Sequence, residues 1–236
     1  MQKLLSYMRS AIQKYDMIED GDKVAVGVSA GKDSLSLLAA MARLRDFYPK
    51  KFELIAITID MRFGDTDGDF GEIADLCDKL GVEYHIIPTN LARLIFDVRK
   101  ESNPCSLCSK MRRGALNKNA KALGCNKVAL GHHLDDVAET LIMNLFSNAS
   151  LNCFMPVTYL DRSDITVIRP MIFARESDCA RTARKLGLPV KKSSCPEDGK
   201  TEREETKQFL SSLEKKYGNI RSKILLAMQN KGINGY

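Results

Sequence analysis

A short stretch of small residues carries the strongest chemical signal in the chain. Residues 27–34 read Gly-Val-Ser-Ala-Gly-Lys-Asp-Ser and stand between a hydrophobic run and an apolar helical pattern. In a tight turn of small residues, consecutive backbone N–H groups converge on an anion, and the positive end of the next helix dipole strengthens the attraction. An ordinary strand-to-helix turn with a serine cap is the alternative. The pattern favours a phosphate-binding loop built from Ser29, Ala30, Gly31, Lys32, Asp33 and Ser34.

The spacing within this stretch excludes a kinase-type P-loop. Such a loop needs a glycine where this chain has Val26, and a serine or threonine where it has Asp33. The stretch instead resembles the loop of the PP-loop ATP pyrophosphatases, which bind the pyrophosphate part of ATP and transfer AMP to a substrate oxygen. Ala30 stands where that family more often has glycine. If the position requires a positive φ, alanine is strained there.

Cysteines form the second set of reactive residues. Cys105 and Cys108 make a Cys-x-x-Cys at the expected start of a helix, where the helix N-terminus and nearby basic residues should lower the thiol pKa. The motif does not follow a strand, which disfavours a thioredoxin-like pair, and no second close pair completes a four-cysteine zinc site. Cys195, in a polar basic loop, is the best candidate for a third cysteine that binds a metal together with Cys105 and Cys108. Three others fit packed core positions: Cys77, Cys125 and Cys179.

A third motif, at residues 131–140, reads Gly-His-His-Leu-Asp-Asp-Val-Ala-Glu-Thr. Asp135 or Asp136 could simply cap the following helix, or could act as a carboxylate that binds magnesium or orients the substrate. The motif follows a predicted strand, at the edge of the sheet where ligands bind in such folds. We therefore expect a catalytic carboxylate here and expect Gly131 and His132 to border the nucleotide.

The elements that must position these motifs alternate along the chain. Short β-branched runs at 24–28, 54–59, 84–87, 128–130 and 165–168 are separated by helical patterns. This order predicts an α/β fold with a parallel sheet of about five strands and helices on both faces. The carboxyl ends of the strands then bring the phosphate loop, the histidine motif and Asp60 to one edge, with Asp60 near the nucleotide or magnesium.

Taken together and in order, the motifs resemble the tRNA 2-thiocytidine synthetase family of PP-loop enzymes. The likeness includes Cys-Ser-Leu-Cys-Ser-Lys-Met-Arg-Arg-Gly at 105–114, Val-Ile-Arg-Pro-Met at 167–171 and Ala-Met-Gln-Asn at 227–230, so it covers nearly the whole chain. The chain lacks the terminal cysteine pairs of the related 2-thiouridine enzymes, which favours the cytidine branch. The resemblance implies an adenine nucleotide alpha hydrolase-like fold.

The resemblance also implies a chemistry. ATP and Mg²⁺ are bound, the O2 of a cytidine in the tRNA anticodon loop attacks the α-phosphorus, and pyrophosphate leaves. A [4Fe–4S] cluster is held by Cys105, Cys108 and Cys195, and three thiolates leave one iron without a protein ligand, where sulfide can bind. This sulfide then displaces AMP from the activated base. The resemblance further implies a catalytic aspartate in the 131–140 motif and places Arg112 where a family member has a lysine at the active site. The alternative for Arg112 is a position on a solvated basic face of the helix.

Composition limits the remaining possibilities. The chain has 236 residues, 44% of them hydrophobic, with a net charge of +6 and seven cysteines. We expect a PP-loop α/β domain at 1–195, a C-terminal helical extension at 196–236, and a cytoplasmic protein with reduced thiols and no membrane segment. The expected partners are tRNA, a sulfur donor (a cysteine desulfurase or sulfide) and a second copy in a homodimer. A PP-loop ligase and a zinc-stapled nucleotide-binding module are the alternatives.

Overall fold

The computed structural model describes residues 1–99, 104–192, 194–197, 199 and 201–236. A mostly parallel sheet with the strand order β3-β2-β1-β4-β6-β5 forms its centre, and β5 runs antiparallel to β6. From β1 the chain adds β2 and β3 on one side and then crosses to add β4 on the other side. Because β1 and β4 are parallel neighbours, their carboxyl ends lie next to each other. The strands are β1 (Asp22–Gly27), β2 (Phe52–Asp60), β3 (Glu83–Pro88), β4 (Lys127–Ala129), β5 (Val157–Leu160) and β6 (Ile165–Ile168).

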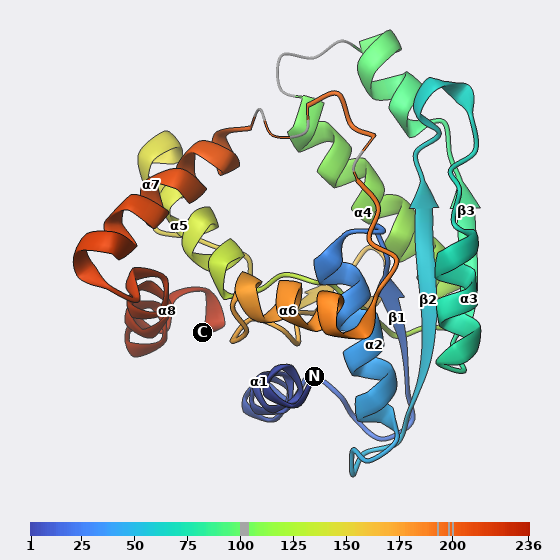
Figure 1. Ribbon diagram of the computed structural model, residues 1–236, viewed down its shortest axis with the longest axis horizontal. Coiled ribbons are helices and arrows are strands. Elements are labelled where there is room, and N and C mark those ends of the chain that lie inside the picture. Colours follow the sequence, from blue (N-terminus) through green and yellow to red (C-terminus); the bar gives the residue numbers. More distant parts are fainter. Residues whose placement is uncertain (100–103, 193, 198, 200) are drawn as a thin grey trace.

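Helices connect the strands and cover both faces of the sheet (Figure 1). Within the described residues, none of them has the length and apolar character that a membrane span requires. The helices are α1 (Gln2–Lys14), α2 (Lys32–Arg45), α3 (Gly71–Lys79), α4 (Pro104–Ala122), α5 (Leu134–Asn148), α6 (Glu176–Leu186), α7 (Glu202–Tyr217) and α8 (Ile220–Lys231). Shorter turns lie at Phe63–Asp65, Arg93–Arg99 and Ile233–Gly235.

The side chains of the central strands point alternately to the two faces of the sheet, which explains why both faces are buried. Val24 and Val26 of β1 belong to a large core with the apolar side chains of α1, α2, α5 and α8. Ala25, between them, points the other way and packs in a second core with Leu116 of α4. Since successive side chains of a strand face opposite sides, a strand that is apolar throughout must be covered twice. The predicted α/β architecture with helices on both faces is confirmed.

The sheet has one more strand than the sequence analysis predicts. β5 is only four residues long, pairs Val157 with Ile168 and Leu160 with Ile165, and is half-exposed. Unlike β4 and β6, whose residues are mostly buried, this edge strand is half-exposed, so no buried apolar run marks it in the sequence. The C-terminal helices expected at 196–236 are α7 and α8, which Gly218 (φ +59°) separates. Both helices pack against α5 at one side of the molecule (Figure 1).

Candidate active site

The phosphate loop joins β1 to α2 and is held by its own hydroxyl groups. The backbone N–H of Ser29 donates to Oγ of Ser34 at 3.1 Å, and this hydroxyl donates to the carbonyl of Gly31 at 3.0 Å. From outside the loop, the backbone N–H of Lys191 donates to the carbonyl of Ala30 at 3.0 Å. These bonds fix the curvature of the loop before any ligand arrives.

Ala30 has φ +60°, the left-handed conformation in which an alanine is strained. The strain lies at Ala30, as the sequence suggests, and not at Gly31, whose φ is −80°. The methyl group of Ala30 is buried in the main core. The loop therefore keeps its shape at a local conformational cost that core packing offsets.

Substitutions at Ala30 should report this balance. In Ala30→Gly, relief of about 1 kcal/mol of left-handed strain is offset by the loss of roughly 0.8 kcal/mol of buried methyl. We expect its free energy of unfolding to stay within about 1 kcal/mol of the parent. Ala30→Val places a β-branched residue in the same conformation and should lose about 2 kcal/mol or more. Urea titration followed by circular dichroism measures both, and equal stability of the valine variant would contradict the assignment of strain.

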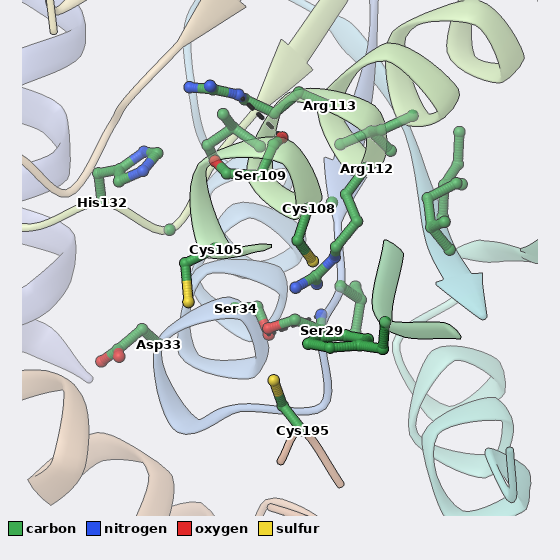
Figure 2. Close-up of a pocket in the computed structure, with 18 residues that line it drawn as sticks. Ser29, Asp33, Ser34, Cys105, Cys108, Ser109, Arg112, Arg113, His132 and Cys195 are labelled. Carbon is green, nitrogen blue, oxygen red and sulfur yellow. Dashed lines mark hydrogen bonds between the residues drawn. The ribbon is translucent and has the colours of Figure 1, made fainter. Parts of the chain in front are cut away.

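A pocket of 460 Å³ opens beside this loop, between the carboxyl ends of β1 and β2 and the first turns of α4 (Figure 2). Gly131 permits the close approach of the histidine motif to the loop, since a Cβ there would lie 3.2 Å from the backbone nitrogen of Ser34. The walls include Ser29, Asp33, Ser34, Cys105, Cys108, Arg112, Arg113, Gly131, His132 and Cys195.

The three predicted ligand cysteines border this one pocket. Cys105 and Cys108 lie in the first turns of α4, and Cys195 points its sulfur toward them from the opposite wall (Figure 2). The expected lowering of the thiol pKa values is wrong for the first two. Burial raises the pKa of Cys105, with Cys195 adding to the effect, and burial raises that of Cys108 although Arg112 opposes it. Partial burial and the proximity of the thiols to one another outweigh the basic neighbours.

A second pocket, of 330 Å³, lies on the other side of Cys105 and Cys195. Asp136 of α5 borders it, and its carboxylate lies 3.3 Å from Nη1 of Arg203 on α7. The same nitrogen is 3.2 Å from Glu139, whose pKa is raised to about 7 by burial and by Asp136. The acidic groups of α5 are thus partly neutralised by Arg203, which comes from a helix far along the chain.

His133 joins the histidine motif to the phosphate loop. Its Nδ1 accepts the N–H of Asp136 and the carboxylate of Asp136 accepts the N–H of His133, a reciprocal cap that begins α5. Its Nε2 lies 3.8 Å from Asp33. Burial disfavours its charge, but the nearby carboxylates of Asp33 and Asp136 outweigh burial and raise its pKa to about 9. His132 is different, because burial lowers its pKa to about 4 and keeps the ring neutral in the pocket wall.

The two aspartates of the motif have different surroundings. Asp135 is buried and borders neither pocket, and its carboxylate accepts the N–H of Glu176 at 2.8 Å and lies 3.3 Å from Arg221. It therefore holds α6 and α8 in place. Asp60 is also engaged, accepting the backbone N–H groups of Arg62 and Gly68 at 3.0 and 2.9 Å. It closes the loop after β2, and the pocket beside this edge is lined by Ile57 and Ile59 instead.

Four charged residues near the loop do not stand out in the sequence. Glu176 and Lys191 contact the loop directly, Arg203 reaches it through the 131–140 motif, and Lys207 reaches it through Glu176. Their sequence contexts are charged helices and a basic loop, which are typical of solvated surface. The sequence offered no local signal that would separate them from their neighbours.

The fold and the loop define a PP-loop protein, and the sequence profile of the PP-loop domain family matches residues 4–213. The tRNA-cytidine(32) 2-sulfurtransferase of Pelobacter propionicus is 39% identical over 223 residues, 93% of this chain and 82% of that protein. The enzyme of the same name from Geobacter sulfurreducens is 37% identical over 231 residues, 97% and 89% of the two chains. The chain belongs to the tRNA-cytidine(32) 2-sulfurtransferase family.

Two solved structures are similar to this chain. The U34-tRNA thiolase NcsA from Methanococcus maripaludis, determined with its [4Fe–4S] cluster, matches with a TM-score of 0.76 and 26% identity over 95% of this chain and 77% of that one. The NH3-dependent NAD synthetase of Campylobacter jejuni matches with a TM-score of 0.50 and 16% identity, over 98% and 96% of the two chains. The second match shows the shared fold alone.

Proposed function

We propose that this chain is an ATP-dependent tRNA sulfurtransferase that converts a cytidine of the anticodon loop into 2-thiocytidine. One observation carries the proposal: Cys105, Cys108 and Cys195 border the same pocket as the phosphate loop. A nucleotide activated by ATP and a thiol-held sulfur source would therefore meet in one cavity. Membership in a family of tRNA-cytidine sulfurtransferases supports the choice of tRNA and of cytidine as substrates.

The residues of the pocket divide the proposed reaction between them. Ser29 and Ser34 bring the N–H groups of the loop to the pocket, where they hold the polyphosphate of ATP, and Arg112 faces the same space from α4. Lys32 adds its charge to the loop from outside the lining of this pocket. The cytidine O2 attacks the α-phosphorus and pyrophosphate leaves. Sulfur then replaces the adenylated oxygen at C2, and AMP is released. Neutral His132 and the apolar side chains of Ile57, Ile59 and Leu130 line the pocket and would exclude water from one side of the cytosine ring.

The three cysteines are the residues that would hold a [4Fe–4S] cluster, because their thiols border one pocket beside the phosphate loop. The structurally similar tRNA thiolase NcsA, determined with its [4Fe–4S] cluster, supports this proposal. When bound by Cys105, Cys108 and Cys195, such a cluster supplies an iron without a protein ligand, where sulfide can bind.

The carboxylates of the site offer one position that suits Mg²⁺. Oδ1 of Asp33 is buried and lacks a hydrogen-bond partner within the described part of the chain. Asp33 borders both pockets. A hard oxygen ligand beside the phosphate loop is what Mg²⁺ needs to join the protein to the phosphates of ATP.

We propose sulfide or a cysteine desulfurase as the sulfur donor and the cytoplasm, where thiols stay reduced, as the compartment.

The two aspartates should respond differently to substitution by asparagine. Asp136 borders the second pocket, and we expect Asp136→Asn to lower the rate of tRNA adenylylation by about 100-fold with little loss of stability. Asp135→Asn removes one of the negative charges that neutralise the buried guanidinium of Arg221, and it should lower the free energy of unfolding by about 2 kcal/mol. Single-turnover AMP transfer and urea titration separate the two effects. The reverse pattern would assign catalysis to Asp135.

Thiolation itself is tested with the full chain, reconstituted with iron and sulfide without oxygen and incubated with ATP and unmodified tRNA. Nuclease digestion and mass spectrometry of the nucleosides should show 2-thiocytidine. If 2-thiouridine appears instead, the substrate is that of the U34-type thiolases. If ATP is bound but neither nucleoside nor AMP forms, the chain is a nucleotide-binding module, and the proposal is wrong.

A further inference from the structure

The lysine of the phosphate loop shares a carboxylate with a second lysine. Nζ of Lys32 lies 2.9 Å from Oε1 of Glu176 and 3.0 Å from Oδ2 of Asp33. Nζ of Lys207, on α7, lies 2.9 Å from the same Oε1 of Glu176. These contacts join the loop, the start of α6 and the C-terminal helix α7 through one oxygen atom.

Glu176 is held in a fixed position for this contact. It is the first residue of α6, and its backbone N–H donates to buried Asp135. Burial alone would raise its pKa, but the hydrogen bonds from Lys207 and Lys32 outweigh burial and lower it to about 2. The group is therefore a carboxylate at neutral pH. The second pocket gives it and Lys207 open space beside the loop.

This arrangement creates a competition at Lys32. In the proposed function Lys32 neutralises the phosphates of ATP, and to do so its ammonium group must share its charge between the phosphates and Glu176. A carboxylate with one cation would hold Lys32 more strongly than a carboxylate with two, because Lys207 neutralises part of its charge. The strength of the Lys32–Glu176 contact therefore depends on a residue 175 positions farther along the chain than Lys32.

We propose that Glu176 and Lys207 are positioning residues that set the affinity of Lys32 for the polyphosphate of ATP. Glu176 competes with the phosphates for Lys32, and Lys207 weakens that competition. The inference rests on the proposed function only in taking the loop at 29–34 as the ATP phosphate site. It predicts effects of opposite sign for the two residues, which a shared structural role would not give.

The test measures equilibrium binding of pyrophosphate and of α,β-methylene-ATP to the full chain by calorimetry. We expect Glu176→Gln to tighten both by about three- to fivefold and Lys207→Met to weaken both by about the same factor, the effect of a partly exposed ion pair. Since Lys207 acts through Glu176, the double variant should bind like Glu176→Gln. In steady-state assays, Lys207→Met should raise the KM for ATP and leave kcat nearly unchanged.

Lys215→Met is the matched control, because Lys215 is an exposed lysine on the same helix. It removes the same charge and should change neither affinity. Weaker binding by Glu176→Gln would overturn the competition, and an equal loss from Lys207→Met in both backgrounds would mean that Lys207 contacts phosphate itself. The failure of tRNA thiolation in the parent protein would refute the proposed function while leaving these binding results to stand on their own.

Discussion

Replacing Cys105, Cys108 or Cys195 by alanine is expected to abolish both assembly of the iron–sulfur cluster and formation of 2-thiocytidine. The three thiols border one pocket, and with only two of them the cluster would expose two irons and lose its hold on the protein. Iron and acid-labile sulfide content after anaerobic reconstitution, together with the visible absorption, measures the loss. Binding of an ATP analogue should persist, because the loop at 29–34 is built from a different part of the chain.

The buried cysteines provide the control. Cys77 and Cys179 are fully buried in the main core, away from the pocket. Their alanine variants should lower the free energy of unfolding by about 1 to 2 kcal/mol and keep the iron content of the parent. A full complement of iron in Cys195→Ala would remove the three-cysteine proposal, even if the variant had lost its activity.

Lys32→Ala should lower the rate of adenylylation by about two to three orders of magnitude, the usual effect of losing one preorganised group that stabilises an anion. The lysine lies at the start of α2, where the backbone N–H groups and the helix dipole already favour phosphate. Iron content should stay unchanged, because Lys32 does not border the pocket that the cysteines share. Lys215→Met again controls for the loss of one charge.

The products of ATP cleavage test the nature of the loop. ATP labelled at the α- or γ-phosphorus, incubated with tRNA and sulfide, should give AMP and pyrophosphate. A γ-phosphoryl transferase would need a hydroxyl for magnesium where this chain has Asp33, whose pKa is held below its usual range by His133 and Lys32 despite burial. Release of ADP and inorganic phosphate would contradict the PP-loop chemistry.

The motifs that depend on neighbouring residues could be predicted from the sequence. The phosphate loop, the start of α4 at the Cys-x-x-Cys and the strain at Ala30 follow from contacts within a few residues. The parallel sheet follows from apolar runs of strand length, and the order of the runs brings Gly131 to the loop. In each case the relevant geometry is set by local backbone conformation and side-chain periodicity.

Only the tertiary structure distinguished Asp135 from Asp136 and found the partners of Lys32. The two aspartates are adjacent in sequence, yet one meets Glu176 and Arg221 in the interior and the other meets Arg203 at a pocket. Helix α7 carries Arg203 and Lys207 in a charged pattern that is equally typical of solvated surface. The chemistry of a carboxylate or an ammonium group depends on the charges packed against it, and folding brings those charges from distant parts of the chain.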